Sequence, residues 1–323
     1  MTAPTVKDTP TRILGRRTAL WEYVGLIALA IWPLISSQYG TGLVTEAFIF
    51  AIAAMSLDLL MGYGGLVSFG HAAFFGLGAY ATVLIGVKLG LSPWTGLVSA
   101  LIVSGLGATI VGYLCMRVAG VAFFMLTLAF AQLFFSAAMK WRGITGGSDG
   151  VGGLARPEIF GLSLSDGRAM YFACMLAFIV SLILLRAIIN SQFGHALVGL
   201  RENETRMRAL GYPASRVKLV AFTIAGIFAG FAGGLHGIYN GFVSPDSLSF
   251  GLSGTFLLMV VLGGAGSLIG PAIGAAVFLL MKQIVSSHTE HWLLIVGIVF
   301  IACVMFFRGG LYALLEQSLR RRL

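Results

Sequence analysis

The most constraining feature of the sequence is a series of long apolar runs that recur along most of its length. Hydrophobic residues make up 58% of the 323 residues and charged residues only 10%. Soluble globular domains carry about 25% charged residues, so a soluble fold is excluded. In lipid, a helix satisfies its own backbone hydrogen bonds and crosses the bilayer with about 20 apolar residues. The sequence therefore predicts an all-α fold, a polytopic bundle of transmembrane helices, with residues 1–323 as one membrane domain.

The apolar runs divide into about ten predicted membrane-crossing segments. Two short, glycine-rich gaps between them, at 62–65 and 263–267, are open to a second interpretation as re-entrant turns. The ten segments lie at about 23–39, 43–61, 66–87, 93–116, 121–139, 168–189, 216–237, 248–263, 268–286 and 291–307.

The basic residues indicate how these segments are oriented. Loops on the cytoplasmic side of membrane proteins carry an excess of Lys and Arg. With an even number of crossings and the amino end inside, most of the 21 Lys and Arg fall on the inner side. This orientation predicts two cytoplasmic tails, at 1–22 and 308–323. It also explains the formal net charge of +9, so no nucleic acid is expected as a partner.

One long segment, residues 140–168, is predicted to lie on the outer side although it carries four basic residues. Asp149, Glu158 and Asp166 offset them in net charge. The segment is rich in glycine, which suits a flexible connector. Long loops in compact proteins more often carry function, so a structured cap that meets an external partner is favoured.

A polar segment at 193–213 interrupts the apolar pattern and has the spacing of a short amphipathic helix. Leu197 and Leu200 belong to an apolar stripe, and charged residues surround it. Gly211 is expected to end the helix and Pro213 to prevent its continuation. The pattern fits equally well an interfacial helix on lipid headgroups and a docking helix bound by a soluble partner.

Small residues recur at intervals of four along one predicted helix and at the entrance to another. Such stripes let another helix approach closely, so helix packing is the favoured role, and an interface that moves during transport is the alternative. The two stripes are Gly226, Gly230 and Gly234, and Gly266, Gly270 and Gly274.

The run from Met61 to Tyr80 places glycines and two polar side chains, Ser68 and His71, at membrane depth. Polar groups in lipid need partners, so they face protein or a water-lined cavity. A lone intramembrane histidine is more often a satisfied packing residue than a ligand for a substrate. Glycine-rich breaks in transmembrane segments nevertheless mark binding sites in several transporter folds.

No catalytic residues, metal ligands or cofactor are predicted. No Lys precedes Ser or Thr, which excludes a phosphate-binding P-loop, and no GxSxG or HExxH sequence occurs. An ion-coupled transporter needs ionisable groups at membrane depth. The candidates for that role lie mostly near the ends of segments, which disfavours it; they are Glu46, Asp58, His71 and Lys282.

Three stretches together resemble the membrane permeases of bacterial branched-chain amino-acid ABC importers, of the LivM type. They are Gly62–Tyr80, Gly194–Ala221 and Gly263–Pro271, and the resemblance spans roughly residues 45 to 312. The most specific piece is Arg201-Glu-Asn-Glu204 followed by Ala209-Leu-Gly211. The family commonly has Gln where Leu66 stands and Asn where Asp58 stands. These departures bear on the substrate, because importers of urea and short amides use similar permeases.

The resemblance implies a bacterial inner-membrane protein that is not itself an enzyme, since ATP is hydrolysed on separate ATPase subunits. The segment 193–213 would be the cytoplasmic coupling helix. A second permease and an extracytoplasmic binding protein are the other expected partners, with lipid around them. Ser68 and His71 are expected along the substrate path. The residues expected at the ATPase are Arg201, Glu202, Asn203, Glu204, Arg208 and Gly211.

Overall fold

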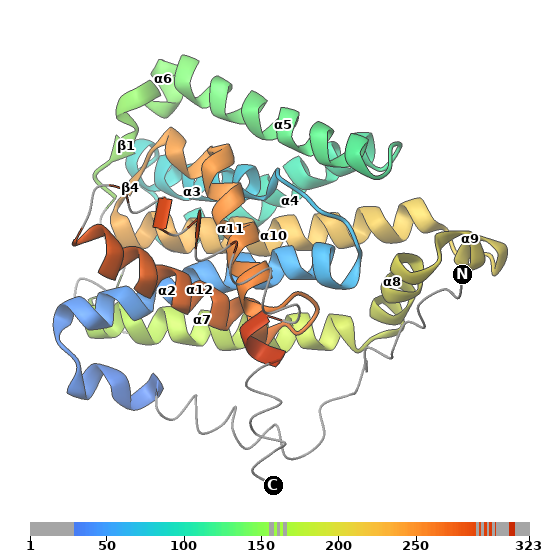
Figure 1. The fold of residues 1–323 in the computed structure, drawn as a ribbon. Helices are drawn as coiled ribbons and strands as arrows, with labels where there is room; N and C mark the ends of the chain where they lie inside the picture. The colour runs from blue at the N-terminus through green and yellow to red at the C-terminus, as the bar shows by residue number, and fades with distance from the viewer. Residues whose placement is uncertain are drawn as a thin grey trace, which may run out of the picture.

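The computed structural model describes residues 29–154, 158–159, 162–163 and 167–288, and beyond them 291, 294–295, 297–298, 301 and 310–313. Over these residues the fold is a bundle of α-helices (Figure 1). The long helices are α2 (Gln38–Asp58), α3 (His71–Lys88), α4 (Pro93–Cys115), α5 (Val121–Lys140), α7 (Gly167–Ile189), α10 (Ala214–Asn240) and α12 (Ile269–Ser286). The shorter helices are α6 (Arg142–Thr145), α8 (Gln192–Glu202), α9 (Glu204–Ala209) and α11 (Phe250–Gly263).

The predicted all-α polytopic bundle is confirmed, but the predicted count of about ten crossings is not. Seven helices in the described residues are long and apolar enough to cross a membrane. The eighth apolar helix, α11, has 14 residues and a length of about 21 Å, which is shorter than the hydrocarbon core. The predicted segment 23–39 is described only from residue 29, where residues 29–35 are helical. The segment 291–307 falls largely outside the described residues.

Both glycine-rich gaps are breaks between helices. After α2 the chain winds through a π-helix, η1 (Leu59–Tyr63), and residues 64–70 then run without helical structure to α3. The predicted segment 66–87 therefore begins too early, because helix α3 starts only at His71. The second break, between α11 and α12, contains Gly264 and Gly266, both with positive φ.

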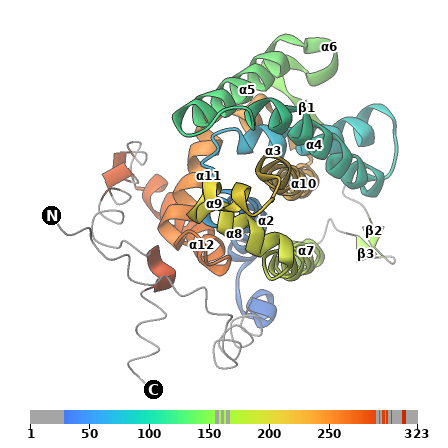
Figure 2. The same ribbon diagram turned by 90° about the vertical axis from the view of Figure 1, so that its right-hand side faces the viewer.

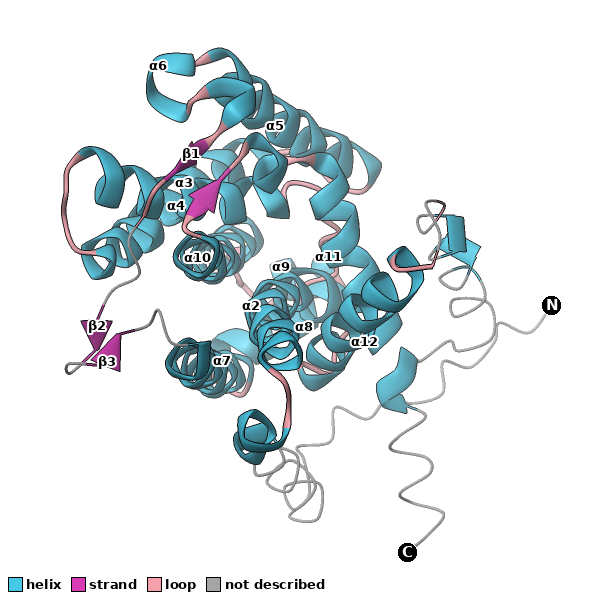
Figure 3. Cartoon of the chain, turned by 90° about the vertical axis from the view of Figure 1, so that its left-hand side faces the viewer, coloured by secondary structure: helices cyan, strands magenta, loops and turns pink. Residues whose placement is uncertain are grey.

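Helix α2 forms the centre of the bundle. Its side chains from Ala47 onward are buried, and the burial continues into η1 as far as Leu60. Figure 3 shows α2 among α7, α10, α11 and α12, all of which contact it. A helix that is apolar on every face is stable only where neighbours cover every face, which explains this position.

The first glycine stripe lies where α10 packs against α4. An added Cβ at Gly226 would collide with Ala108, and one at Gly230 would collide with Ser104. At Gly234 it would lie 3.1 Å from the Cβ atom of Ala100. Two stripes of small residues, each with a period of four, therefore face each other, and they allow the close approach expected from the sequence.

The second stripe begins ahead of its helix, because α12 starts at Ile269 and Gly266 lies in the preceding turn, inside the predicted gap 263–267. Gly270 and Gly274 do lie in the helix. An added Cβ at Gly274 would lie 2.8 Å from the backbone nitrogen of Gly263, at the end of α11. These two glycines let α12 fold back closely onto α11.

The loop after α5 is folded in its described part. It contains α6, the 3₁₀-helix η2 (Gly147–Asp149), and three short strands, β1 (Val151–Gly152), β2 (Glu158–Ile159) and β3 (Leu162–Ser163). Strand β1 pairs antiparallel with β4 (Phe242–Val243), which the 3₁₀-helix η3 (Pro245–Leu248) follows, and β2 pairs with β3. Residues 141–154 thus form a structured segment rather than a flexible connector. Its outer location stays a prediction.

Helices α8 and α9 lie at the end of the bundle opposite to this folded loop (Figure 1). Figure 2 looks onto that end and shows α8 beside α7 and in front of α2. In the contacts of the chain, α8 touches η1, α7 and α10. The polar segment of the sequence therefore covers the end of the central helix.

Candidate functional site

The polar segment folds as two short helices, so the prediction of one helix over 193–211 is wrong. Helix α8 ends at Glu202, and Asn203 takes an extended conformation with φ −156°. The Asn203 side chain then accepts a hydrogen bond from the backbone N–H of Arg206 at 2.9 Å. Asparagine is among the best N-cap residues because its side chain satisfies a free donor of the next helix. Asn203 therefore starts α9, which turns the chain between the helices.

Gly211 ends α9 as the sequence predicted. Its φ is +87°, a conformation that glycine adopts without steric cost. The N–H of Gly211 donates to the carbonyl of Arg208 at 3.0 Å, and the N–H of Tyr212 donates to that of Met207 at 3.1 Å. These two bonds form a Schellman motif, which satisfies the last carbonyls of the helix.

Two of the charged residues of α9, Glu204 and Arg208, are paired within the chain. Glu204 accepts hydrogen bonds from Arg208 at 2.7 Å and from Lys218 of α10 at 2.6 Å. The hydrogen bond from Lys218 is the main cause that holds the pKa of Glu204 below its ordinary value, and Arg208 adds to it. This network fixes α9 against the start of α10, so two of the residues expected at the ATPase also have a structural role.

Arg201 is exposed at the end of α8, and its side chain reaches back to the first break. Its guanidinium Nη1 donates a hydrogen bond to the carbonyl of Gly62 in η1. Its side-chain stem lies close to Gly65, where an added Cβ would be 2.7 Å from Arg201 Cγ. Arg201 therefore connects the polar segment with the first break of the bundle. Glu202, the next expected residue, is exposed.

An exposed patch remains on the outer side of α9. Leu210 is 68% exposed and Tyr212 is 45% exposed. A shallow pocket of about 300 Å³ next to them is lined by Arg208, Tyr212, Pro213, Ala214, Ser215 and Arg216. We call Leu210, Tyr212, Arg208 and Arg216 the α9 patch. The sequence reasoning did not single out Tyr212, although an aromatic residue directly after the glycine stop was visible.

His71 is a buried, hydrogen-bonded residue at the start of α3. Its Nε2 lies 2.7 Å from Ser56 Oγ, which in turn donates to the carbonyl of Ala53 at 2.8 Å. Because the Ser56 hydroxyl uses its hydrogen for Ala53, the geometry assigns the ring proton of His71 to Nε2. Nδ1 is then an acceptor, and in the described structure it has no partner.

Ser68 lies in the break just before His71. Its hydroxyl accepts a hydrogen bond from the backbone N–H of Gly70 at 3.2 Å, and its side chain is fully buried. Neither Ser68 nor His71 faces a surface of this chain. Contact of either with a substrate would require the surrounding helices to part.

Asp58 is the other buried polar group at the breaks. Its carboxylate accepts hydrogen bonds from the backbone N–H groups of Gly266 at 2.7 Å and Leu268 at 3.2 Å. The side chain has no exposed surface. As both oxygens hold the backbone of the turn before α12, Asp58 is placed to fix that turn rather than to carry an ion.

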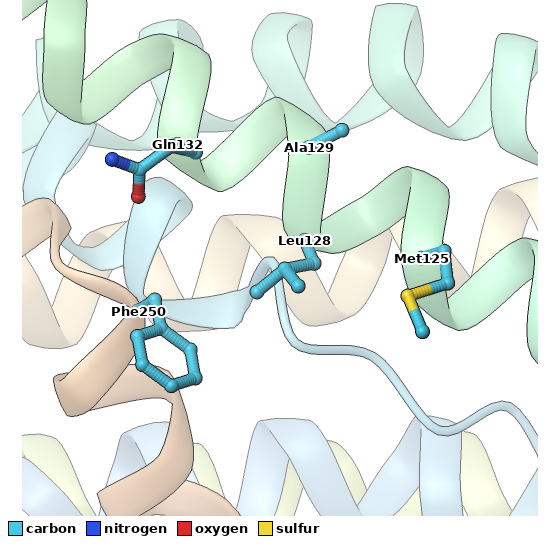
Figure 4. Close-up of a pocket in the computed structure, with 5 residues that line it drawn as sticks. All are labelled: Met125, Leu128, Ala129, Gln132 and Phe250. Carbon is cyan, nitrogen blue, oxygen red and sulfur yellow. The ribbon is translucent and has the colours of Figure 1, made fainter.

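A second pocket of about 300 Å³ lies between α5 and the start of α11. Figure 4 shows its lining residues, which are Met125, Leu128, Ala129, Gln132 and Phe250. Gln132 is the only polar side chain among them. The sequence reasoning missed this pocket because its walls come from helices that are more than 100 residues apart in the chain.

The geometry of the site does not identify the protein family, but comparison with known proteins does. A family model described as "Branched-chain amino acid transport system / permease component" matches residues 40–304. The chain belongs to this family. The match includes both breaks, α8, α9 and the described part of the loop after α5. No solved structure shows a significant match to the chain.

Individual relatives agree with the family. The chain is 29% identical to the high-affinity branched-chain amino acid transport system permease protein LivM of Salmonella typhimurium, over 92% of this chain and 76% of that protein. The chain is also 29% identical to LivM of Escherichia coli, again over 92% of this chain and 76% of that protein. The probable LivM of Methanocaldococcus jannaschii is 25% identical over 78% of this chain and 83% of its own length. The autoinducer 2 import system permease LsrC of Escherichia coli is 27% identical, over 52% of this chain.

Family membership makes the chain a membrane permease component. Among the described residues, no group of three His, Cys, Asp or Glu side chains is arranged to hold a metal ion. The polar groups at the breaks are instead bound to backbone atoms or to each other.

Proposed function

We propose that this chain is the membrane-spanning permease subunit of an ATP-binding-cassette importer for leucine, isoleucine and valine. The observation that carries the proposal is the match of the branched-chain permease family over residues 40–304. The two LivM proteins that cover 92% of the chain support the same substrate class.

The ATPase subunits bind α8, α9 and the α9 patch in this proposal. The patch combines exposed Leu210 and Tyr212 with arginines, and buried apolar anchors surrounded by charge are typical of protein interfaces. Arg201, Glu202, Asn203, Glu204, Arg208 and Gly211 are the residues expected there, and most of them shape or fix this segment. ATP hydrolysis takes place on the partner, so this chain is not an enzyme.

The orientation follows from that assignment. The chain lies in the bacterial inner membrane with α8 and α9 on the cytoplasmic side, together with both termini. The folded segment 141–154 at the opposite end then faces outward, where an extracytoplasmic binding protein delivers the amino acid. Lys88 Nζ donates to the carbonyl of Gly143 at 2.6 Å, which ties this outer segment to the end of α3.

A second, homologous permease completes the translocation path. In the most apolar 18-residue stretch of helix α5 only 22% of the residues are buried, compared with 78% for α2 and η1. The outer face of α5 is therefore free to meet lipid or another subunit. Ser68 and His71 line the path when the helices part. The free acceptor at His71 Nδ1 is suited to receive a proton donor such as the ammonium group of an amino acid.

Two other functions are distinguished by experiment. An importer of urea or short amides shares the architecture and differs only in what it transports. An ion-coupled transporter would act without ATP, but Asp58, one of its few candidate ion carriers, is bound to the backbone of the turn before α12.

The test is affinity purification of the full chain from its native membrane, followed by identification of the bound proteins. We expect ATPase subunits and a second permease to co-purify. Changing Leu210→Glu together with Tyr212→Ser places charge and polarity in the α9 patch, and should release the ATPase while the permease pair remains. The matched control is Val118→Glu, a single charge placed at an exposed position (39%) in the turn after α4.

Retention of the ATPase by the doubly changed chain would contradict the docking assignment. Recovery of the chain without an ATPase, but active in vesicles under an ion gradient, would contradict the importer itself.

A further inference from the structure

Three backbone segments that are far apart in the sequence meet at the end of helix α2. They are the end of α8, the first break at Gly62–Gly65, and the turn Gly264–Leu268 before α12. Two charged side chains join them, Arg201 on one side and Asp58 on the other. We propose that these contacts form a mechanical link, which transmits movement of α8 to α12 during transport.

The first half of the link joins α8 to the break. Arg201 donates to the carbonyl of Gly62, one of the last carbonyls of the α2–η1 helix, which lacks an intrahelical partner. A cation is also favoured at this helix end by the helix dipole. Leu197, fully buried, packs beside Gly64, where an added Cβ would lie 3.3 Å from its Cδ1. Displacement of α8 therefore acts directly on residues 62–65.

The second half joins the break to α12. Asp58 accepts the N–H groups of Gly266 and Leu268. The backbone of Gly62 packs directly on Gly266, because an added Cβ at Gly62 would collide with both Asp58 and Gly266 and lie 2.8 Å from Gly266 Cα. No side chain can fit between the two breaks, so they move together or separate completely.

The turn itself is held in an unfavourable conformation. Leu268 has φ +56° and ψ −49°, and the N–H of Ile269 donates to the carbonyl of Ser267 at 2.6 Å, which is the geometry of the rare and strained form of the γ-turn. Such conformations persist only where surrounding contacts determine them. The bond from Leu268 to Asp58 is one of these contacts, so loss of the carboxylate should let the turn relax and α12 shift.

The π-helical form of η1 fits this role. A π-helix is rare, occurs mostly as a single turn and is frequent at functional sites. It begins directly after Asp58, which holds the turn before α12, and it contains Gly62, which receives Arg201. Arg201 and Asp58 are therefore positioning residues, which act on the substrate path through the backbone.

The link rests on the proposed function, because it requires that the ATPase moves α8. It is tested in the complete importer, reconstituted in proteoliposomes. The readouts are the amount of leucine taken up per ATP hydrolysed and the amount of ATPase bound. We expect Arg201→Met and Asp58→Ala each to lower uptake per ATP by about threefold to tenfold, the effect that changes within a coupling network produce. ATPase binding should stay unchanged in Asp58→Ala, because the Asp58 side chain is buried and lies outside the docking segment.

Conservative and matched variants separate coupling from general damage. Arg201→Lys keeps a cationic donor near Gly62 and should retain most of the wild-type ratio. Arg117→Met removes an exposed arginine that contacts Tyr113 at the end of α4, outside the link. Thr82→Val removes a buried hydrogen bond of 3.1 Å to the carbonyl of Gly96, also outside the link. Both controls should keep the wild-type ratio.

The double variant Arg201→Met with Asp58→Ala is decisive, because the two residues act in series. Its ratio should be no lower than that of the more affected single variant, as residues in one network are not additive. A loss in the double variant equal to the product of the two single losses, or a normal ratio in both single variants, would overturn the link. If Asp58→Ala fails to assemble, the comparison of Arg201→Met with Arg201→Lys decides alone. Absence of ATP-driven uptake in the wild type would instead reject the proposed function, and the link with it.

Discussion

At the scale of single residues, backbone proximity rather than side-chain chemistry holds the bundle together. A Cβ atom added at Gly230 of α10 would collide with Ser104 of α4. It would also lie 3.1 Å from the carbonyl oxygen of Ala100 on the same helix. Gly78 of α3 approaches the backbone of the same glycine. A helix pair without large side chains between it gains its stability from close van der Waals contact over the whole stripe.

The change Gly230→Ala should therefore destabilise the protein, although alanine favours a helix. The added methyl group must push α4 and α10 apart, which costs roughly 1–3 kcal/mol for overpacking. The measurement is the thermal unfolding of the purified protein in detergent. Gly254→Ala is the control, because Gly254 lies in helix α11 and an added Cβ meets only an aromatic carbon of Phe69 at 4.0 Å. Equal melting temperatures for the two variants would contradict the close packing of α4 and α10.

Glu204 makes the anchoring of α9 dependent on pH. Its pKa in the folded protein is lower than the ordinary value of 4.5, chiefly because Lys218 donates to it. Its stabilising contribution is therefore fully present above about pH 4.5 and is lost as the pH falls through the lower, folded pKa. Protonation should free α9 from α10.

Hydrogen exchange of the amides at 204–212, followed between pH 6 and 3, measures this effect. After correction for the intrinsic exchange rate, protection should fall below pH 4.5 in the wild type. In Glu204→Gln it should be low at pH 6 already and change little on acidification. The same pH dependence in both proteins would show that the ion pairs do not hold α9.

At the scale of helices, the decisive local feature is the break at Asn203, which turns one predicted helix into two. Charge and apolar spacing continued through this position, so a single helix was the simpler prediction. An asparagine three residues before Arg206 is a recognisable cap signal, but in the middle of a helical pattern it competes with continuation. The end of the segment at Gly211 was easier to predict because glycine and proline follow α9 directly.

Removal of the cap tests the two-helix arrangement. Asn203→Ala should reduce the local stability of α9 by about 1 kcal/mol, because the N–H of Arg206 loses its acceptor. Amide exchange of residues 205–209 should speed up by about fivefold, the factor to which that energy corresponds. The control is Thr205→Ala, an exposed position two residues further along the chain. Slower or unchanged exchange in Asn203→Ala would indicate that α8 and α9 join into one helix.

The long helices could be predicted from the sequence, since apolar length alone specifies them. The contacts of Asp58 could not, because its backbone partners are 208 and 210 residues away and carry no side-chain signal. The partner of His71, Ser56, is 15 residues away across a break whose geometry no periodicity indicates. Residues that bind backbone across distant segments thus stay invisible until the fold is known.

At the scale of the whole molecule, the described structure has a largely buried central helix and a sparsely buried periphery. In the most apolar 18-residue stretch of each helix, 78% of the residues are buried for α2 with η1, but only 22% for α5 and for α7. The folded segment 141–154 lies at one end of the bundle, and α8 with α9 at the other. A path for a substrate has to run between these ends, and the two facing breaks lie between them at the end of α2. This arrangement suits a subunit that is moved from one end by a partner and receives its substrate at the other.

The most direct test is uptake of radiolabelled leucine by proteoliposomes that contain this chain with its co-purified partners and binding protein. The importer predicts uptake that requires ATP hydrolysis, persists when ion gradients are collapsed, and is inhibited by unlabelled isoleucine and valine but not by urea. Leucine uptake by this chain alone, without ATP and driven by an ion gradient, would contradict it.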